Sequence, residues 1–290
     1  METETNIPMQ EFNTPSSNLK KHFIAMLLFL IPVAILLLTY PAANERGKNN
    51  TDSIIKLKKS FPDVNISAKS VYVWDAGNQK VIYAKNEKVQ LPLASLAKVM
   101  AALVALDEVD GSAKVKITSE SIKQEGDSGL ANEERWRLKD LINFSLVTSS
   151  NDGIYAVASA IESQKSSSTE IKIITERENI LANENNRENF IELMNKKAGD
   201  IALNDTFYLN ETGLDSSGDE NGGYGTAEDM AKLFAYIIKN KPEVLEATAY
   251  EEIKLTSLDE LSHNAQNTNE IIRSIPNLIA SKTGYTDLSG

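Results

Sequence analysis

Hydrophobic positions change their spacing several times along the chain, and each spacing predicts a different element. The run "SVYVWDAGNQKVIYA" has two β-rich stretches around a turn with Gly77 and Asn78, which predicts a β-hairpin that starts a sheet. The run from Leu96 to Leu106 is apolar on nearly every side and too short to span a bilayer. It therefore predicts a buried central helix.

Amphipathic spacing predicts further helices. The clearest begins at Thr226, whose hydroxyl can cap the helix with Asp229 three residues on, and ends at Pro242. Its apolar face consists of Met230, Leu233, Phe234, Ile237 and Ile238. Similar spacing fits residues 138–148, 151–162 and 190–201.

The remaining segments complete the predicted architecture. Residues 163–189 are polar and of low complexity, which predicts a solvated insertion. The last apolar segment, "LIASKTGYT", predicts a strand that returns to the sheet. Strands at both ends with helices between them indicate an α/β (α+β) fold, a sheet covered by a helical subdomain.

The N-terminal part carries a membrane signal. Residues 23–40 contain no charged side chain and follow Lys20 and Lys21, which predicts a transmembrane anchor with a cytoplasmic segment at 1–22. An uncleaved anchor is favoured over a cleaved signal, for which "PAA" is the available site. A juxtamembrane linker at 41–60 and an extracytoplasmic domain at 61–290 would follow, making a single-pass membrane protein.

Composition excludes several classes of function. A net charge of −11 argues against a nucleic-acid partner, and the absence of cysteine excludes disulfides, thiolate nucleophiles and cysteine-bound zinc. The two histidines, His22 and His263, are too few for a Ser-His-Asp hydrolase and a typical zinc peptidase, because His22 lies on the cytoplasmic side.

A serine and a lysine stand inside the predicted buried helix, at Ser95 and Lys98 in "SLAK". Positions three apart share a helix face, so the amine can reach the hydroxyl. Burial lowers the pKa of a lysine, and a neutral amine can take the serine proton. The pair therefore predicts a nucleophile and its base, whereas Ser17/Lys20 and Ser53/Lys56 have the same spacing outside a buried helix.

Two further motifs follow in order, "SSN" at 149–151 and "KTG" at 282–284. The order S-x-x-K, S-x-N, K-T-G is the signature of serine penicillin-binding proteins and serine β-lactamases. Each motif has a structural alternative: Ser149 and Asn151 could cap the helix that begins near Asp152, and "SKTGYT" could be an ordinary strand and turn. The three motifs in this order favour the catalytic interpretation.

The chain also resembles the D-alanyl-D-alanine carboxypeptidases, the low-molecular-weight penicillin-binding proteins, over residues 65–290. Blocks such as "LINFSLVTSSNDG", "YGTAEDMAKLFAYI" and "NLIASKTGYTDLSG" carry the resemblance. It implies an antiparallel sheet flanked by helices, with an inserted helical subdomain. It also implies action on peptidoglycan stem peptides ending in D-Ala-D-Ala, inhibition by β-lactams, a position at the cytoplasmic membrane, and no cofactor or metal.

The resemblance implies a role for each matching residue. Ser95 would attack the carbonyl between two D-alanines, Lys98 would accept its proton, and Ser149 would relay a proton to the departing amine.

The other matching positions would bind substrate. Asn151 would bond its peptide backbone, Lys282 and Thr283 its terminal carboxylate, and Gly284 would allow a close approach. The backbone N–H groups of Ser95 and Tyr285 would form the oxyanion hole.

Two alternatives stay open. A class A β-lactamase adds a glutamate within E-x-x-x-N, a pattern found after the middle motif only at Glu260/Asn264, close to "KTG". A weakly catalytic penicillin-binding sensor is the other, although the intact Ser95/Lys98 pair argues against it.

The chain departs from the family pattern at two points. Its middle motif reads "SSNDG" where the family favours S-G-N-D-A, and it ends six residues after Gly284. In the family another antiparallel strand and a C-terminal helix follow, so we expect the protein to continue past Gly290, with one edge of residues 282–286 unpaired in this chain.

Overall fold

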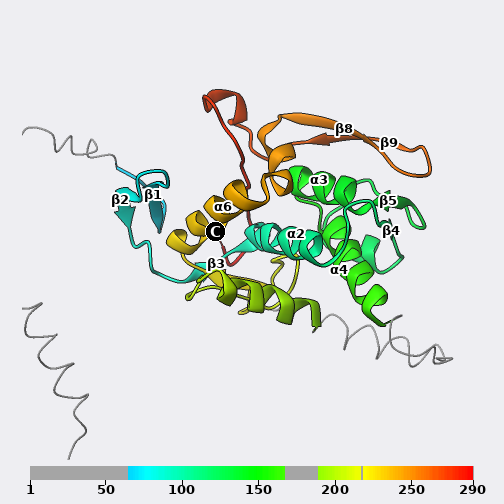
Figure 1. The fold of residues 1–290 in the computed structure, drawn as a ribbon, viewed down its shortest axis with the longest axis horizontal. Helices are drawn as coiled ribbons and strands as arrows, with labels where there is room; N and C mark the ends of the chain where they lie inside the picture. The colour runs from blue at the N-terminus through cyan, green and yellow to red at the C-terminus, as the bar shows by residue number, and fades with distance from the viewer. Residues whose placement is uncertain (1–64, 167–188, 217, 290) are drawn as a thin grey trace, which may run out of the picture. The chain divides into compact units, whose positions relative to one another are not determined.

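Small antiparallel sheets around a group of helices make up the part of the chain that the computed structural model describes, residues 65–166, 189–216 and 218–289 (Figure 1). All of it belongs to one unit, Phe61–Gly290. The strands are β1 Val71–Asp75, β2 Lys80–Lys85, β3 Leu91–Pro92, β4 Lys114–Lys116, β5 Arg135–Arg137, β6 Phe207–Tyr208, β7 Gly223–Gly225, β8 Glu252–Thr256 and β9 Ser262–Gln266. The helices are α2 Ala97–Glu108, α3 Leu138–Thr148, α4 Asn151–Ser166, α6 Ala227–Asn240 and one over 189–200.

The strands of the described residues form four separate antiparallel sheets. β1 pairs with β2, β4 with β5 and β8 with β9, while β3, β7 and β6 form a three-stranded sheet in that order. The predicted hairpin is confirmed, because Val71 faces Lys85 across an antiparallel pair whose turn lies at 76–79. β1 lies against α6, and β8 and β9 lie against α3.

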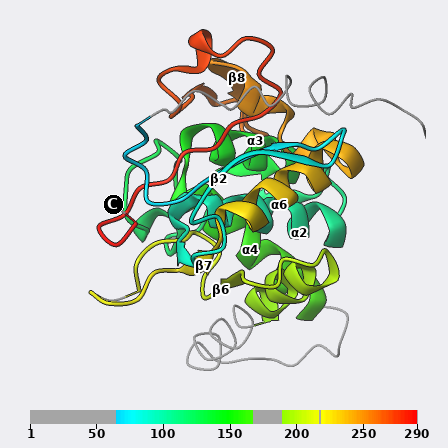
Figure 2. The ribbon, with the colours of Figure 1, turned by 90° about the vertical axis from the view of Figure 1, so that its left-hand side faces the viewer.

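The predicted helices form where the apolar spacing placed them. α2 is the buried central helix, with every residue from Ala97 to Ala105 buried, and it packs against α3 and α4 (Figures 1 and 2). α3 has the predicted bounds, and α4 extends to Ser166, into the predicted insertion. The hydroxyl of Thr226 accepts the N–H of Asp229 at 3.1 Å, so the predicted cap of α6 is confirmed.

The predicted strand at 278–286 is not formed. No described strand pairs with this segment, and a strand needs a neighbour to satisfy its N–H and C=O groups. The segment instead comes from the β8–β9 side of the unit, drawn in red in Figures 1 and 2, and reaches the turn before α2, where Gly284 packs against Leu93, Ala94 and Ser95.

The predicted membrane location is corrected. Among the residues that the structure describes, none of the helices has the length and apolar character needed to cross a membrane. The segments 1–22, 23–40 and 41–60, and residues 167–188 of the predicted insertion, lie outside the described residues.

Candidate active site

Ser95 and Lys98 meet at the start of the buried helix. Ser95 lies in a single 3-10 turn, Ala94–Leu96, and Lys98 in the first turn of α2. The Lys98 side chain is fully buried, and its Nζ donates to Ser95 Oγ at 2.9 Å and to the Thr212 carbonyl at 2.6 Å. The structure therefore brings together the nucleophile and base that the sequence predicted.

The surroundings of Lys98 favour its neutral form. Burial lowers its pKa well below the usual lysine value, and the nearby cation of Lys282 lowers the pKa further, while Glu211 acts in the opposite direction. A lysine whose amine is neutral and bonded to a hydroxyl can remove that hydroxyl's proton.

The turn that presents Ser95 has an unusual backbone. Ala94 has a φ of +47°, in the left-handed region that alanine seldom adopts. Gly213 packs against this turn with a φ of +77°. A Cβ at this glycine would lie 1.8 Å from the Ala94 carbonyl oxygen. Only glycine lets the two backbones approach so closely.

The middle motif lies at the junction of α3 and α4. Ser149 ends α3 in the left-handed conformation, with φ of +61°, and its Oγ accepts a hydrogen bond from Lys282 Nζ at 2.8 Å. The side chain that caps the start of α4 is that of Ser150, because its Oγ accepts the N–H of Gly153 at 2.9 Å. Ser149 is thus directed toward the third motif.

Asn151 has one satisfied and one unsatisfied side-chain atom. Its Nδ2 donates to the Glu125 carbonyl at 2.6 Å, whereas its buried Oδ1 has no hydrogen-bond partner among the described residues. A buried acceptor without a donor is unfavourable by about 1–3 kcal/mol. A ligand N–H that reached Oδ1 would remove this cost.

The third motif contacts both of the others, with Lys282 bonded to Ser149 and Gly284 packed against Ser95. The Lys282 Nζ also donates to the Thr283 carbonyl at 2.6 Å, and burial lowers its pKa to about 7. Tyr285 follows Gly284, which packs against Ser95, and it is 74% exposed.

A family model described as D-alanyl-D-alanine carboxypeptidase matches residues 56–170 and 181–290. The chain belongs to this carboxypeptidase family. D-alanyl-D-alanine carboxypeptidase DacF of Bacillus subtilis is 27% identical over 90% of this chain, which spans 59% of that relative's length. DacB2 of Mycobacterium tuberculosis is 26% identical over 81% of this chain and 72% of the relative.

Solved structures confirm the predicted fold class. The D-alanyl-D-alanine carboxypeptidase from Mycobacterium tuberculosis H37Rv superposes with a TM-score of 0.64 at 24% identity, over 80% of this chain and 78% of that one. Penicillin-binding protein D2 from Listeria monocytogenes in its ampicillin-bound form gives 0.58 at 24% identity, over 79% and 83%. The family member therefore has the penicillin-binding protein fold.

One residue near the third motif, Thr268, was not among the site residues predicted from the sequence. The hydroxyl of Thr268 contacts the hydroxyl of Thr283, and its backbone N–H donates to the Val147 carbonyl at 3.2 Å. Thr268 follows β9 in an exposed loop, with no periodic pattern around it. No signal in a single sequence marks a contact between two threonines fifteen residues apart.

Gly284 offers a test of how closely the third motif must approach Ser95. A Cβ at this position would lie 3.2 Å from the Ala94 Cβ, the Leu93 carbonyl oxygen and the Ser95 nitrogen. Gly284→Ala should push the segment away by a few tenths of an ångström and slow acylation by about 10- to 100-fold, since reaction rates fall steeply with misplacement.

The check is the rate of labelling by a fluorescent penicillin together with thermal unfolding. Gly199→Ala, at a helical glycine with no atom within 4 Å of the added Cβ, is the matched control and should keep the wild-type rate. Wild-type labelling by Gly284→Ala would show that the close approach does not matter.

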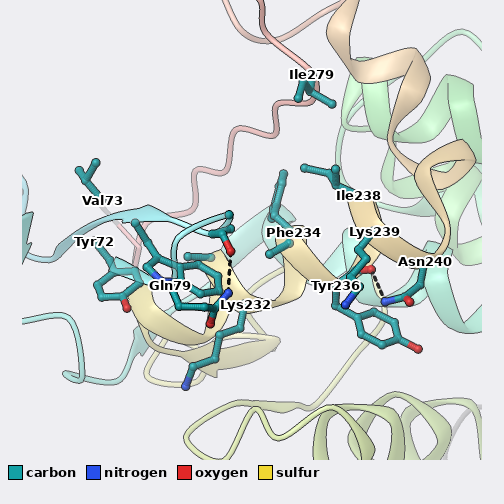
Figure 3. Close-up of a pocket in the computed structure, with 15 residues that line it drawn as sticks. Tyr72, Val73, Gln79, Lys232, Phe234, Tyr236, Ile238, Lys239, Asn240 and Ile279 are labelled. Atoms are coloured by element: carbon teal, nitrogen blue, oxygen red, sulfur yellow. Dashed lines mark hydrogen bonds between the residues drawn. The ribbon is translucent and has the colours of Figure 1, made fainter. Parts of the chain in front are cut away.

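The described residues also contain an apolar pocket that is separate from these motifs (Figure 3). It has a volume of about 880 Å³ between the β1–β2 hairpin and α6, with Tyr72, Phe234 and Ile238 among its lining residues. None of the eight predicted site residues lines it. The candidate active site is therefore marked by its chemistry and not by this pocket.

Proposed function

We propose that this chain removes the terminal D-alanine from peptidoglycan stem peptides that end in D-Ala-D-Ala, through an ester on Ser95. The observation that carries the proposal is the bond between the fully buried Lys98 amine and the Ser95 hydroxyl. Membership of the carboxypeptidase family and two relatives named as D-alanyl-D-alanine carboxypeptidases support the substrate class.

In the proposed acylation step, Lys98 takes the proton of Ser95 as Oγ attacks the carbonyl carbon of the penultimate D-alanine. The oxygen that becomes negative is stabilised by the backbone N–H groups of Ser95 and Tyr285. The C–N bond then breaks, and the proton that Lys98 took from Ser95 passes through the Ser149 hydroxyl to the departing D-alanine amine, which leaves Lys98 neutral. The Lys282 bond to Ser149 orients this hydroxyl.

Three further residues, Lys282, Thr283 and Asn151, would bind the substrate. The terminal carboxylate of the substrate would lie against Lys282 and Thr283, and its negative charge would favour the protonated form of Lys282, whose pKa burial lowers to about 7. The unsatisfied Oδ1 of Asn151 would accept an N–H from the peptide backbone.

The ester is then hydrolysed. Water attacks the acyl carbonyl, Lys98 accepts the water proton, and Lys98 returns this proton to Ser95 Oγ as the ester bond breaks. A β-lactam would follow the same acylation, because its ring amide resembles the acyl-D-Ala-D-Ala backbone. Its opened ring stays attached to the acyl group, so its adduct should persist.

Ser95→Ala should abolish covalent labelling of the full chain by a fluorescent penicillin and release of D-alanine from a D-Ala-D-Ala peptide. The reason is that no oxygen nucleophile then lies beside the Lys98 amine. Ser53→Ala, which removes the serine of another S-x-x-K, is the control and should label normally. Labelling of Ser95→Ala, or an adduct mapped to Ser53, would exclude the assignment.

The same assay separates the reaction classes. Free D-alanine from the monomeric peptide together with a persistent penicillin adduct supports the carboxypeptidase. Rapid hydrolysis of the penicillin without D-alanine release would identify a β-lactamase.

A further inference from the structure

Glu211 is a buried acidic residue that none of the three motifs contains. It lies in the loop between β6 and β7, and 1% of its surface is exposed. The next residue, Thr212, accepts a hydrogen bond from Lys98 Nζ through its carbonyl at 2.6 Å. Glu211 is thus a buried acidic residue whose sequence neighbour contacts the proposed base directly.

The loop that carries Glu211 is fixed in place. The Oδ1 of Asn210 accepts the backbone N–H groups of Thr212 at 3.2 Å and Gly213 at 2.7 Å. Gly213 in turn lies against the Ala94 carbonyl, immediately before Ser95. These bonds hold the backbone on both sides of Glu211 against the turn that presents the nucleophile.

Among the described residues, Lys282 and Glu211 carry the charges that act on Lys98. The cation of Lys282 disfavours a second positive charge at Lys98, and the carboxylate of Glu211 favours it. When Lys98 takes the Ser95 proton it becomes an ammonium without hydration, so a nearby negative charge stabilises that state.

We infer that Glu211 is a positioning residue of the active site, whose carboxylate sets the pH range in which Lys98 accepts the Ser95 proton. This inference rests on the proposed function, because it assumes that Lys98 is the base for acylation. It assigns Glu211 no contact with substrate. Its effect passes through the protonation of Lys98.

The direction of the effect follows from the charges. Loss of the Glu211 carboxylate disfavours the protonated form of Lys98, so the amine becomes neutral at a lower pH. Acylation requires the neutral amine, and its rate therefore rises with pH through the pKa of Lys98. In Glu211→Gln this rise should move to lower pH by about one unit, the low end of the effect of a nearby opposite charge.

The measurement is the second-order rate of labelling by a fluorescent penicillin as a function of pH, using the full chain. Glu220→Gln is the matched control, since Glu220 is an exposed glutamate of the same loop, and its pH profile should superimpose on that of the wild type. Thermal unfolding establishes that each variant is folded. Glu211→Asp keeps the charge and should keep the wild-type pH profile.

Three results would overturn the inference. The pH profile of Glu211→Gln could coincide with that of the wild type, or the profile of a folded Glu211→Asp could move as far as that expected for Gln. Normal acylation with a blocked release of the adduct would instead make Glu211 a base for hydrolysis. Failure of the proposed function is distinct, because the wild-type chain itself would then not label.

Discussion

Replacing Lys98 with arginine should slow acylation of Ser95 by about 10²- to 10⁴-fold, the range that a general base contributes. The amine of Lys98 is fully buried beside the Ser95 hydroxyl, where burial lowers its pKa and makes the neutral form accessible. A guanidinium stays protonated under these conditions and cannot accept a proton. Arginine therefore introduces a permanent positive charge and removes the base.

A second variant separates chemistry from packing. Lys98→Met keeps an unbranched side chain of similar length without any charge, so it should fold and also fail to acylate. The measurements are penicillin labelling, D-alanine release and thermal unfolding of the full chain. Labelling near the wild-type rate in Lys98→Met would show that Ser95 is activated by another group.

The helices could be predicted from the sequence because their signals are local. The apolar run of α2, the spacing in 138–148 and the Thr226 cap all lie within the element they define. The hairpin was predicted for the same reason, as its strands and turn are contiguous.

The sheets beyond the hairpin could not be predicted in this way. β3, β6 and β7 contain two or three residues each, too few to show alternation. The segment 278–286 has strand-like residues and still forms no strand, since pairing depends on a neighbouring strand that local sequence does not specify. Strand propensity is a property of one segment, whereas a sheet forms only where two segments pair.

In the active site, too, local motifs could be predicted and contacts between distant residues could not. The motifs at 95–98, 149–151 and 282–284 could be recognised because each is short and ordered along the chain. The bond from Lys282 to Ser149 spans 133 positions and the bond from Lys98 to Thr212 spans 114. The loop between β6 and β7 contacts the Ser95 turn through Gly213 and Lys98 through the Thr212 carbonyl, and no local pattern in the sequence marks either contact.

Gly213→Ala should be among the most destabilising single substitutions in this chain. The added Cβ would lie 1.8 Å from the Ala94 carbonyl oxygen and 2.5 Å from its carbon, both backbone atoms, at a φ of +77°. The positive φ costs alanine about 1–3 kcal/mol and the forced backbone shift about 1–3 kcal/mol more. The sum is a large part of the 5–15 kcal/mol, in order of magnitude, that keeps a domain folded.

Gly129 separates these two contributions, because it has the same φ of +77° with no atom within 4 Å of an added Cβ. Gly129→Ala should therefore show the conformational cost alone, and the difference in unfolding free energy between the two variants measures the contact with Ala94. Denaturant unfolding of the full chain provides both values. Any Gly213→Ala protein that remains folded should also label slowly with penicillin, since Ala94 must move and Ser95 follows it in the chain. Equal destabilisation by the two substitutions would mean that the loop between β6 and β7 yields without displacing the nucleophile.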